Sequence, residues 1–137
     1  MAEAGRVLWV TGAGSGMGRA AAVAAAAGGR RVALSGRRAE ALDDVAQAVR
    51  AAGGEALVVP LDVTDVAAIE AAHDTIADAW GGVDDLVLSA GLNTPRRTWS
   101  DQRIDDFQAI VATNLTAVAA VVQASIEDLR AASGVVV

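Results

Sequence analysis

A glycine-rich segment near the amino terminus has residue types and spacing that suit the binding of a phosphate group. Gly12, Gly16 and Gly18 follow the apolar run at residues 7–10 and open a stretch with helical character. Glycines let the backbone approach a pyrophosphate closely, and the amino end of a helix offers N–H groups and a positive dipole end to an anion. We therefore predict a nucleotide phosphate site. Its expected contact residues are Gly12, Ser15, Gly16, Met17 and Gly18.

Glycines also occur in ordinary turns and at helix ends, so their context decides between the two interpretations. An apolar run precedes this turn and a helical pattern follows it, which favours the nucleotide site. The spacing is G-x-x-x-G-x-G, because Met17 and Arg19 stand where G-x-G-x-x-G would need glycine. A Walker phosphate loop is excluded, because its lysine is missing.

Short apolar runs alternate with longer helical patterns, which is typical of βαβ units and a parallel sheet. Apolar strands of this kind fit a sheet that helices cover on both faces. We expect a doubly wound α/β fold with strand order 3-2-1-4-5, because crossovers between parallel strands are right-handed. The expected strands are residues 6–10, 31–35, 56–60, 85–89 and 134–137, and the expected helices are residues 16–27, 39–52, 66–80 and 101–131.

The glycine turn and four later segments, in the same order, resemble those of the short-chain dehydrogenase/reductase family. The family's cofactor turn reads T-G-x-x-x-G-x-G, as residues 11–18 do here. Residues 61–63 resemble its adenine-contacting Asp-Val step, and residues 86–91 resemble the strand end under the cofactor. Residues 113–115 resemble the helix segment with the family's asparagine, and residues 134–137 resemble the start of its fifth strand. The resemblance implies site residues Asp62, Val63, Ser89, Ala90, Gly91 and Asn114.

The resemblance also implies one Rossmann-type dinucleotide-binding domain over residues 1–137, truncated at the fifth strand. One departure concerns Leu88 and Ser89, which replace the family's usual pair of asparagines. A serine hydroxyl has a shorter reach than an asparagine and no amide donor. Two interpretations of Ser89 stay open. Its side chain either holds the strand end or is simply small, and in both cases its backbone should lie by the cofactor.

The residues after the second expected strand bear on the choice between NAD and NADP. An NAD site of this kind usually has a carboxylate there that binds the ribose 2′-OH. This sequence has Ser35, Gly36, Arg37 and Arg38 instead. A guanidinium can bind a 2′-phosphate with two parallel hydrogen bonds, whereas a carboxylate would repel the phosphate. We predict NADP rather than NAD, with Arg37 as the main contact and Arg38 and Ser35 as helpers. The alternative is an exposed arginine pair that only solvates a helix start.

Asn114 interrupts an apolar stripe in the fourth expected helix. Phe107, Val111, Asn114, Val118 and Val122 share one helical face, so we expect Asn114 to be buried and hydrogen-bonded. One account is a bond to a neighbouring backbone. The family account is that Asn114 is catalytic: it kinks the helix and holds a water that relays protons to a lysine.

The sequence contains no tyrosine and no lysine, the two residues of the family's Y-x-x-x-K catalytic motif. The family transfers a hydride between nicotinamide and a carbonyl or alcohol substrate, and a tuned group must move the proton. We therefore predict the N-terminal part of an NADP-dependent oxidoreductase, inactive by itself and a homo-oligomer when full length. The alternatives are a complete non-catalytic nucleotide-binding or interaction module and, more weakly, another Rossmann-like protein such as a methyltransferase.

Composition limits the other classes of function. The formal net charge is −6, which argues against nucleic acid or an anionic membrane as partner. There is no cysteine and only one histidine, so no metal site or disulfide is expected. No secretory signal is visible, and we expect a cytoplasmic protein. His73, Trp9 and Trp80 are expected in the packed interior, while Trp99 fits a substrate pocket or an oligomer contact.

Overall fold

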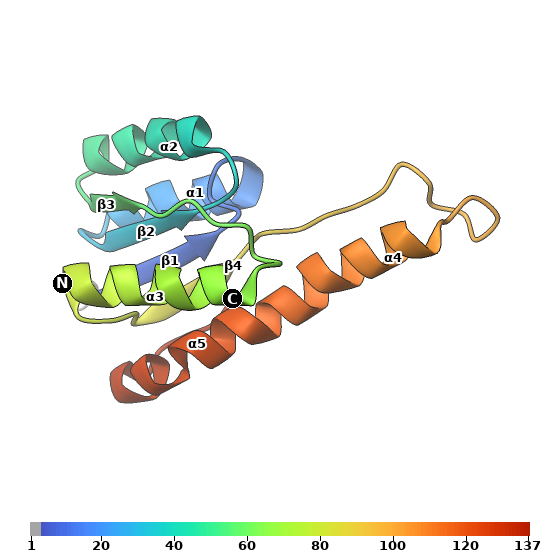
Figure 1. The fold of residues 1–137 in the computed structure, drawn as a ribbon. Helices are drawn as coiled ribbons and strands as arrows, with labels where there is room; N and C mark the ends of the chain where they lie inside the picture. Colours follow the sequence, from blue (N-terminus) through green and yellow to red (C-terminus); the bar gives the residue numbers. More distant parts are fainter. Residues whose placement is uncertain (1–3) are drawn as a thin grey trace.

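A four-stranded parallel sheet forms the centre of the computed structural model, which describes residues 4–137. The strand order is β3-β2-β1-β4, and Figure 1 shows helices on both faces of the sheet. This arrangement confirms the expected doubly wound fold. The strands are β1 (Val7–Thr11), β2 (Arg31–Ser35), β3 (Glu55–Val58) and β4 (Asp85–Leu88).

Two helices cover each face of the sheet, and together they bury two separate apolar cores. Alternate side chains of a strand point to opposite faces, so Leu8 and Val10 enter one core while Val7 and Trp9 enter the other. The first core packs against α1 (Gly16–Ala26) and α2 (Ala39–Ala51), and the second against α3 (Val66–Trp80) and α5 (Ala117–Ala132).

The expected fifth strand is a single β-bridge rather than a strand. Val136 pairs with Leu86 in parallel, next to β4, which is the position that the order 3-2-1-4-5 requires. The N–H of Val135 donates to the Asp85 carboxylate at 2.8 Å rather than to a strand backbone. Backbone hydrogen bonds nevertheless join the segment to β4: the Leu86 N–H donates to the Val135 carbonyl at 2.9 Å, and the Val137 N–H donates to the Leu86 carbonyl at 3.0 Å.

The fourth expected helix begins later, at Ile104, and is interrupted by a π-helical turn. It consists of α4 (Ile104–Val111), η1 (Ala112–Thr116) and α5. The predicted stripe is wrong as the buried face, because α4 has no buried residue, Phe107 is exposed, and Val118 and Val122 are only partly buried. The buried residues beyond the π turn are Ala117, Val121, Ser125 and Leu129.

The α4 helix and the loop before it project from the sheet as an arm, at the right of Figure 1. Trp99 and Ile104 on this arm are largely exposed. Ile104–Ala132 is long and apolar enough to cross a membrane by length and composition, but core helices of soluble proteins meet the same criterion. Here α5 packs against α3 and the sheet, as a core helix does.

An ionic network joins the opposite end of the sheet to the carboxy-terminal segment. Asp85 at the start of β4 is buried and accepts hydrogen bonds from Arg6 at 3.1 and 3.2 Å, from Arg30 and from the N–H of Val135. Burial by itself raises the pKa of Asp85, but these bonds outweigh it and hold the pKa below its ordinary value. The network links β1, the turn before β2, β4 and the last residues.

Candidate functional site: the carboxyl edge of the sheet

The predicted cofactor residues lie on loops that leave the same edge of the sheet. All strands are parallel, so the residues after Thr11, Ser35, Val58 and Leu88 share this edge. Ligands of open α/β sheets bind outside the carboxyl ends of the strands. The predicted cofactor residues, although far apart in the sequence, therefore lie along one edge of the sheet.

The glycine turn packs against the loop after β4. Gly12 has a φ of +63°, and a Cβ there would lie 2.6 Å from the backbone of Ser89 and Ala90. A Cβ on Gly18 would lie 2.9 Å from the carbonyl carbon of Gly12 and 3.2 Å from the Ser89 Cβ. Only glycine allows these close approaches. The turn therefore brings the predicted Ser89 and Ala90 beside the predicted glycines.

The amino end of α1 leaves room and N–H donors for an anion. Ser15 precedes the helix with an extended backbone, and its side chain does not cap the helix. Gly16 has a φ of +56°, and nothing described lies within 4 Å of the position of its missing Cβ. Met17 is largely exposed, and the first turn has no acidic residue. The open cradle and these donors fit the pyrophosphate of a dinucleotide.

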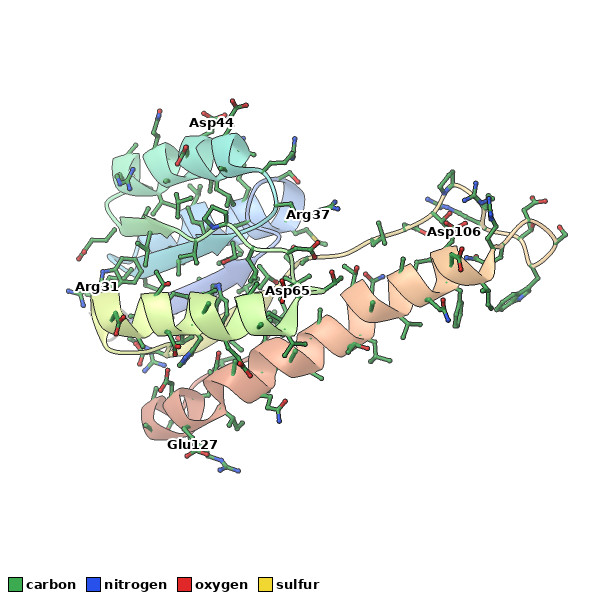
Figure 2. All side chains as sticks on the ribbon, viewed as in Figure 1. Arg31, Arg37, Asp44, Asp65, Asp106 and Glu127 are labelled. Carbon is green, nitrogen blue, oxygen red and sulfur yellow. The ribbon has the colours of Figure 1, made fainter. Side chains whose placement is uncertain are left out.

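Arg37 lies on the turn after β2, where its exposed side chain extends outward near the start of α2 (Figure 2). Arg38 is also exposed and directly precedes α2. Ser35, in contrast, is fully buried, and its hydroxyl accepts a hydrogen bond from the Trp9 indole at 2.9 Å. The prediction of Ser35 as a direct helper is therefore wrong, because its side chain points into the core.

Asp62 and Val63 lie in the loop after β3, on the same edge. Val63 is buried, whereas Asp62 is exposed and accepts hydrogen bonds from the Thr64 N–H at 3.0 Å and hydroxyl at 2.7 Å. These bonds lower the pKa of Asp62, and the charge of Arg37 lowers it further. The Arg37 guanidinium is thus close enough to Asp62 for the two charges to interact.

A shallow pocket opens beside these residues. The Thr11 and Leu88 strand ends and the predicted Val63 and Ala90 form part of its wall. Side chains of η1 and α5 complete the pocket, and sequence reasoning did not assign them to the site. Adjacency to Asn114 was the only signal for Thr113. The additional lining residues are Thr113, Ala117, Val118 and Val121.

Asn114 occupies the π turn and is exposed, so its expected burial is wrong. Its side chain pairs twice with one backbone unit: Oδ1 accepts from the Leu92 N–H at 2.7 Å, and Nδ2 donates to the Leu92 carbonyl at 2.9 Å. The account of a bond to a neighbouring backbone is confirmed. Asn114 thus lies in the π turn with its side chain directed to the loop beyond Gly91.

We expect Asn114→Ala to loosen the loop at residues 91–103, because the variant loses both bonds to Leu92. At roughly 0.5–1.5 kcal/mol for each bond, the local stability should fall by about 1–3 kcal/mol. Hydrogen exchange of the loop amides measures this change. Asn114→Asp retains an acceptor for the Leu92 N–H, so its exchange rates should lie between those of the unaltered chain and Asn114→Ala. Unchanged amide exchange in both variants would show that the Asn114 side chain does not stabilise the loop.

The histidine and the tryptophans of the sequence lie away from this edge. His73 is half-buried as expected, and its Nε2 lies 2.7 Å from Oδ2 of Asp128 on α5. Trp9 is fully buried and Trp80 partly buried, while the Trp99 ring lies 6.3 Å from that of Phe107 on the arm. Within residues 4–137 there is no cluster of three potential metal ligands.

Comparison with known proteins identifies the family. A family model described as short chain dehydrogenase matches residues 6–137. The chain belongs to the short-chain dehydrogenase family. This family comprises NAD(P)-binding oxidoreductases that act on small alcohols and carbonyl compounds.

Curated relatives of this short-chain dehydrogenase chain include two dehydrogenases named for cyclic alcohols. It is 39% identical to cis-4-hydroxycyclohexanecarboxylate dehydrogenase of Sinomonas cyclohexanicum, over 99% of this chain and 55% of the relative. It is 36% identical to 2,5-dichloro-2,5-cyclohexadiene-1,4-diol dehydrogenase of Sphingobium indicum, over 92% of this chain and 50% of the relative. The chain thus spans about half the length of these relatives.

Solved short-chain dehydrogenase structures share the fold over nearly the whole chain. A metagenomic short-chain oxidoreductase in complex with NADP is 32% identical, with a TM-score of 0.92, over 99% of this chain and 62% of the other. An alcohol dehydrogenase of Thermococcus sibiricus, complexed with 5-hydroxy-NADP, is 27% identical, with a TM-score of 0.90, over 96% and 56%.

Proposed function

We propose that this chain is the cofactor-binding part of an NADP-dependent short-chain oxidoreductase. The domain would extend over residues 1–137, and the whole enzyme would interconvert a small alcohol and its carbonyl compound. The main support is the open, glycine-lined edge of the sheet with an exposed Arg37 on the turn after β2. The cofactor, when bound, supplies or accepts the hydride.

In this proposal each segment of the edge contacts a different part of the cofactor. The amino end of α1 binds the pyrophosphate through N–H groups, with Gly12, Ser15, Gly16, Met17 and Gly18 as contacts. The loop after β3 contacts the adenine through Asp62 and Val63. Ser89, Ala90 and Gly91 lie under the nicotinamide half, and Asn114 fixes the loop that continues from them through Leu92.

The preference for NADP in this proposal depends on charge. No acidic residue occupies positions 35–38, where a carboxylate would bind a ribose 2′-OH and repel a 2′-phosphate. Arg37 would bind the 2′-phosphate, with Arg38 nearby. Two similar solved structures carry NADP or a modified NADP, which supports this choice.

The proton step requires groups that this sequence does not contain. The sequence has no tyrosine and no lysine, and it spans about half the length of its relatives. We infer that the chain is a piece of a longer enzyme. Homo-oligomer formation and a cytoplasmic location stay predictions for that enzyme.

We expect the 137-residue chain to bind NADPH without oxidising it. Titration calorimetry measures binding, and loss of NADPH absorbance with ketones, aldehydes and quinones measures turnover. The matched control is a chain extended by the carboxy-terminal half of a relative that carries the tyrosine and lysine. Steady turnover by the short chain would contradict the proposal, and binding without turnover in both chains would favour a non-catalytic nucleotide-binding module.

A further inference from the structure

The indole of Trp9 on β1 makes a buried hydrogen bond to the neighbouring strand β2. Its Nε1 donates to the Ser35 hydroxyl at 2.9 Å, and both residues have no exposed surface. Trp9 belongs to a buried apolar cluster and has no exposed surface, so bulk water does not reach the indole N–H. Loss of either partner leaves a buried polar group unpaired, which makes the bond costly to break.

Ser35 lies where three segments of the cofactor edge meet. It ends β2 and pairs with Thr11, the last residue of β1. Its carbonyl accepts the N–H of Ala13 in the glycine turn at 3.0 Å. The carbonyl of the next residue, Gly36, accepts the N–H of Leu61 at 2.9 Å, and Leu61 directly precedes Asp62. Ser35 therefore lies beside the segments expected to contact the pyrophosphate and the adenine, which its backbone and that of Gly36 bind, and two residues before Arg37.

Arg37 depends on this backbone for its position. Its side chain is exposed, and within residues 4–137 its guanidinium makes no hydrogen bond. Arg37 is only two residues beyond Ser35, the last residue of the buried strand β2, and Gly36 lies between them. The group that fixes Ser35 thus fixes the start of the turn that carries Arg37.

We propose that Trp9 is a positioning residue for NADP selectivity, acting through Ser35 on the turn that carries Arg37. This inference rests on the proposed binding of a 2′-phosphate by Arg37. The indole N–H holds the Ser35 side chain in the core, and the strand end keeps Arg37 at a fixed distance from the glycine turn. Without that bond the turn gains freedom, and binding must restrict it again at a cost in affinity.

The test compares NADPH and NADH binding to the 137-residue chain by titration calorimetry. Trp9→Phe and Ser35→Ala each remove one partner and should weaken NADPH binding about fivefold but NADH binding less than twofold. Trp80→Phe is the matched control, because Trp80 packs on the same core and should change neither affinity. Ser35→Thr retains the hydroxyl and should retain the NADPH preference. Equal weakening for both cofactors, or no change, would overturn the proposal.

A second measurement on the unaltered chain covers variants that fail to fold. The indole N–H resonance of Trp9 should shift more with NADP than with NAD, while that of Trp80 should not distinguish them. An equal Trp9 shift would overturn the proposal. Arg37→Ala separates a failure of the proposed 2′-phosphate binding from a failure of the proposed role of Trp9. If the unaltered chain has no NADPH preference, 2′-phosphate binding fails and this inference with it. If Arg37→Ala abolishes a preference that Trp9→Phe retains, only the role of Trp9 fails.

Discussion

Gly12→Ala is expected to reduce the free energy of unfolding by about 2–5 kcal/mol and to abolish cofactor binding. Two costs add at this position. A non-glycine residue at a φ of +63° costs about 1–2 kcal/mol. The new Cβ would also lie 2.6 Å from the backbone of Ser89 and Ala90, and overpacking of this kind costs about 1–3 kcal/mol or more. Because backbone atoms cannot rotate away, β1 and the loop after β4 would have to separate.

Gly5→Ala provides the matched control for this variant. Gly5 has a φ of +80°, but nothing described lies within 4 Å of its missing Cβ. Only the conformational cost applies there, so its loss should be about 1–2 kcal/mol. Urea unfolding of both variants measures the difference. Equal losses would show that the close approach of Gly12 to Ser89 and Ala90 does not limit the fold.

Arg37→Ala should weaken NADPH binding by about 1.5–3 kcal/mol, which corresponds to about a 10- to 150-fold rise in Kd. The physical reason is the loss of a charge-assisted pair with the 2′-phosphate. NADH lacks this phosphate, so its Kd should change little. Titration calorimetry with both cofactors measures the two effects on the same protein preparation.

Two neighbouring changes sharpen the test of Arg37. Arg37→Lys keeps the charge but loses the planar fork, so NADPH affinity should fall between those of the unaltered chain and Arg37→Ala. Arg38→Ala removes the same charge one residue later and should have a smaller effect, since Arg38 is only an expected helper. Equal weakening of NADPH and NADH binding in Arg37→Ala would show that Arg37 does not bind the 2′-phosphate.

The pattern and spacing of residues along the chain were enough to predict the layered fold and the edge at which the site lies. Hydrophobic periodicity predicted the four strands and α1, α2 and α3, and α3 begins and ends where the pattern indicated. The reason is local: a strand buried on both faces must be apolar throughout, and left-handed glycines such as Gly81 end helices. The glycine spacing and the order of later segments were also enough to indicate the family.

Which side chains of these elements face the site depends on how the elements pack, and the sequence pattern does not show this. The buried row of α5 includes Val121 rather than Val122, and Asn114 in the π turn is exposed and binds Leu92. Helical periodicity read along the sequence reveals neither the π turn nor the row of side chains that packs. The bond from Trp9 to Ser35 was equally invisible, because it joins residues 26 positions apart. Register between neighbouring strands brings these residues together, and that register is set by packing across the whole sheet.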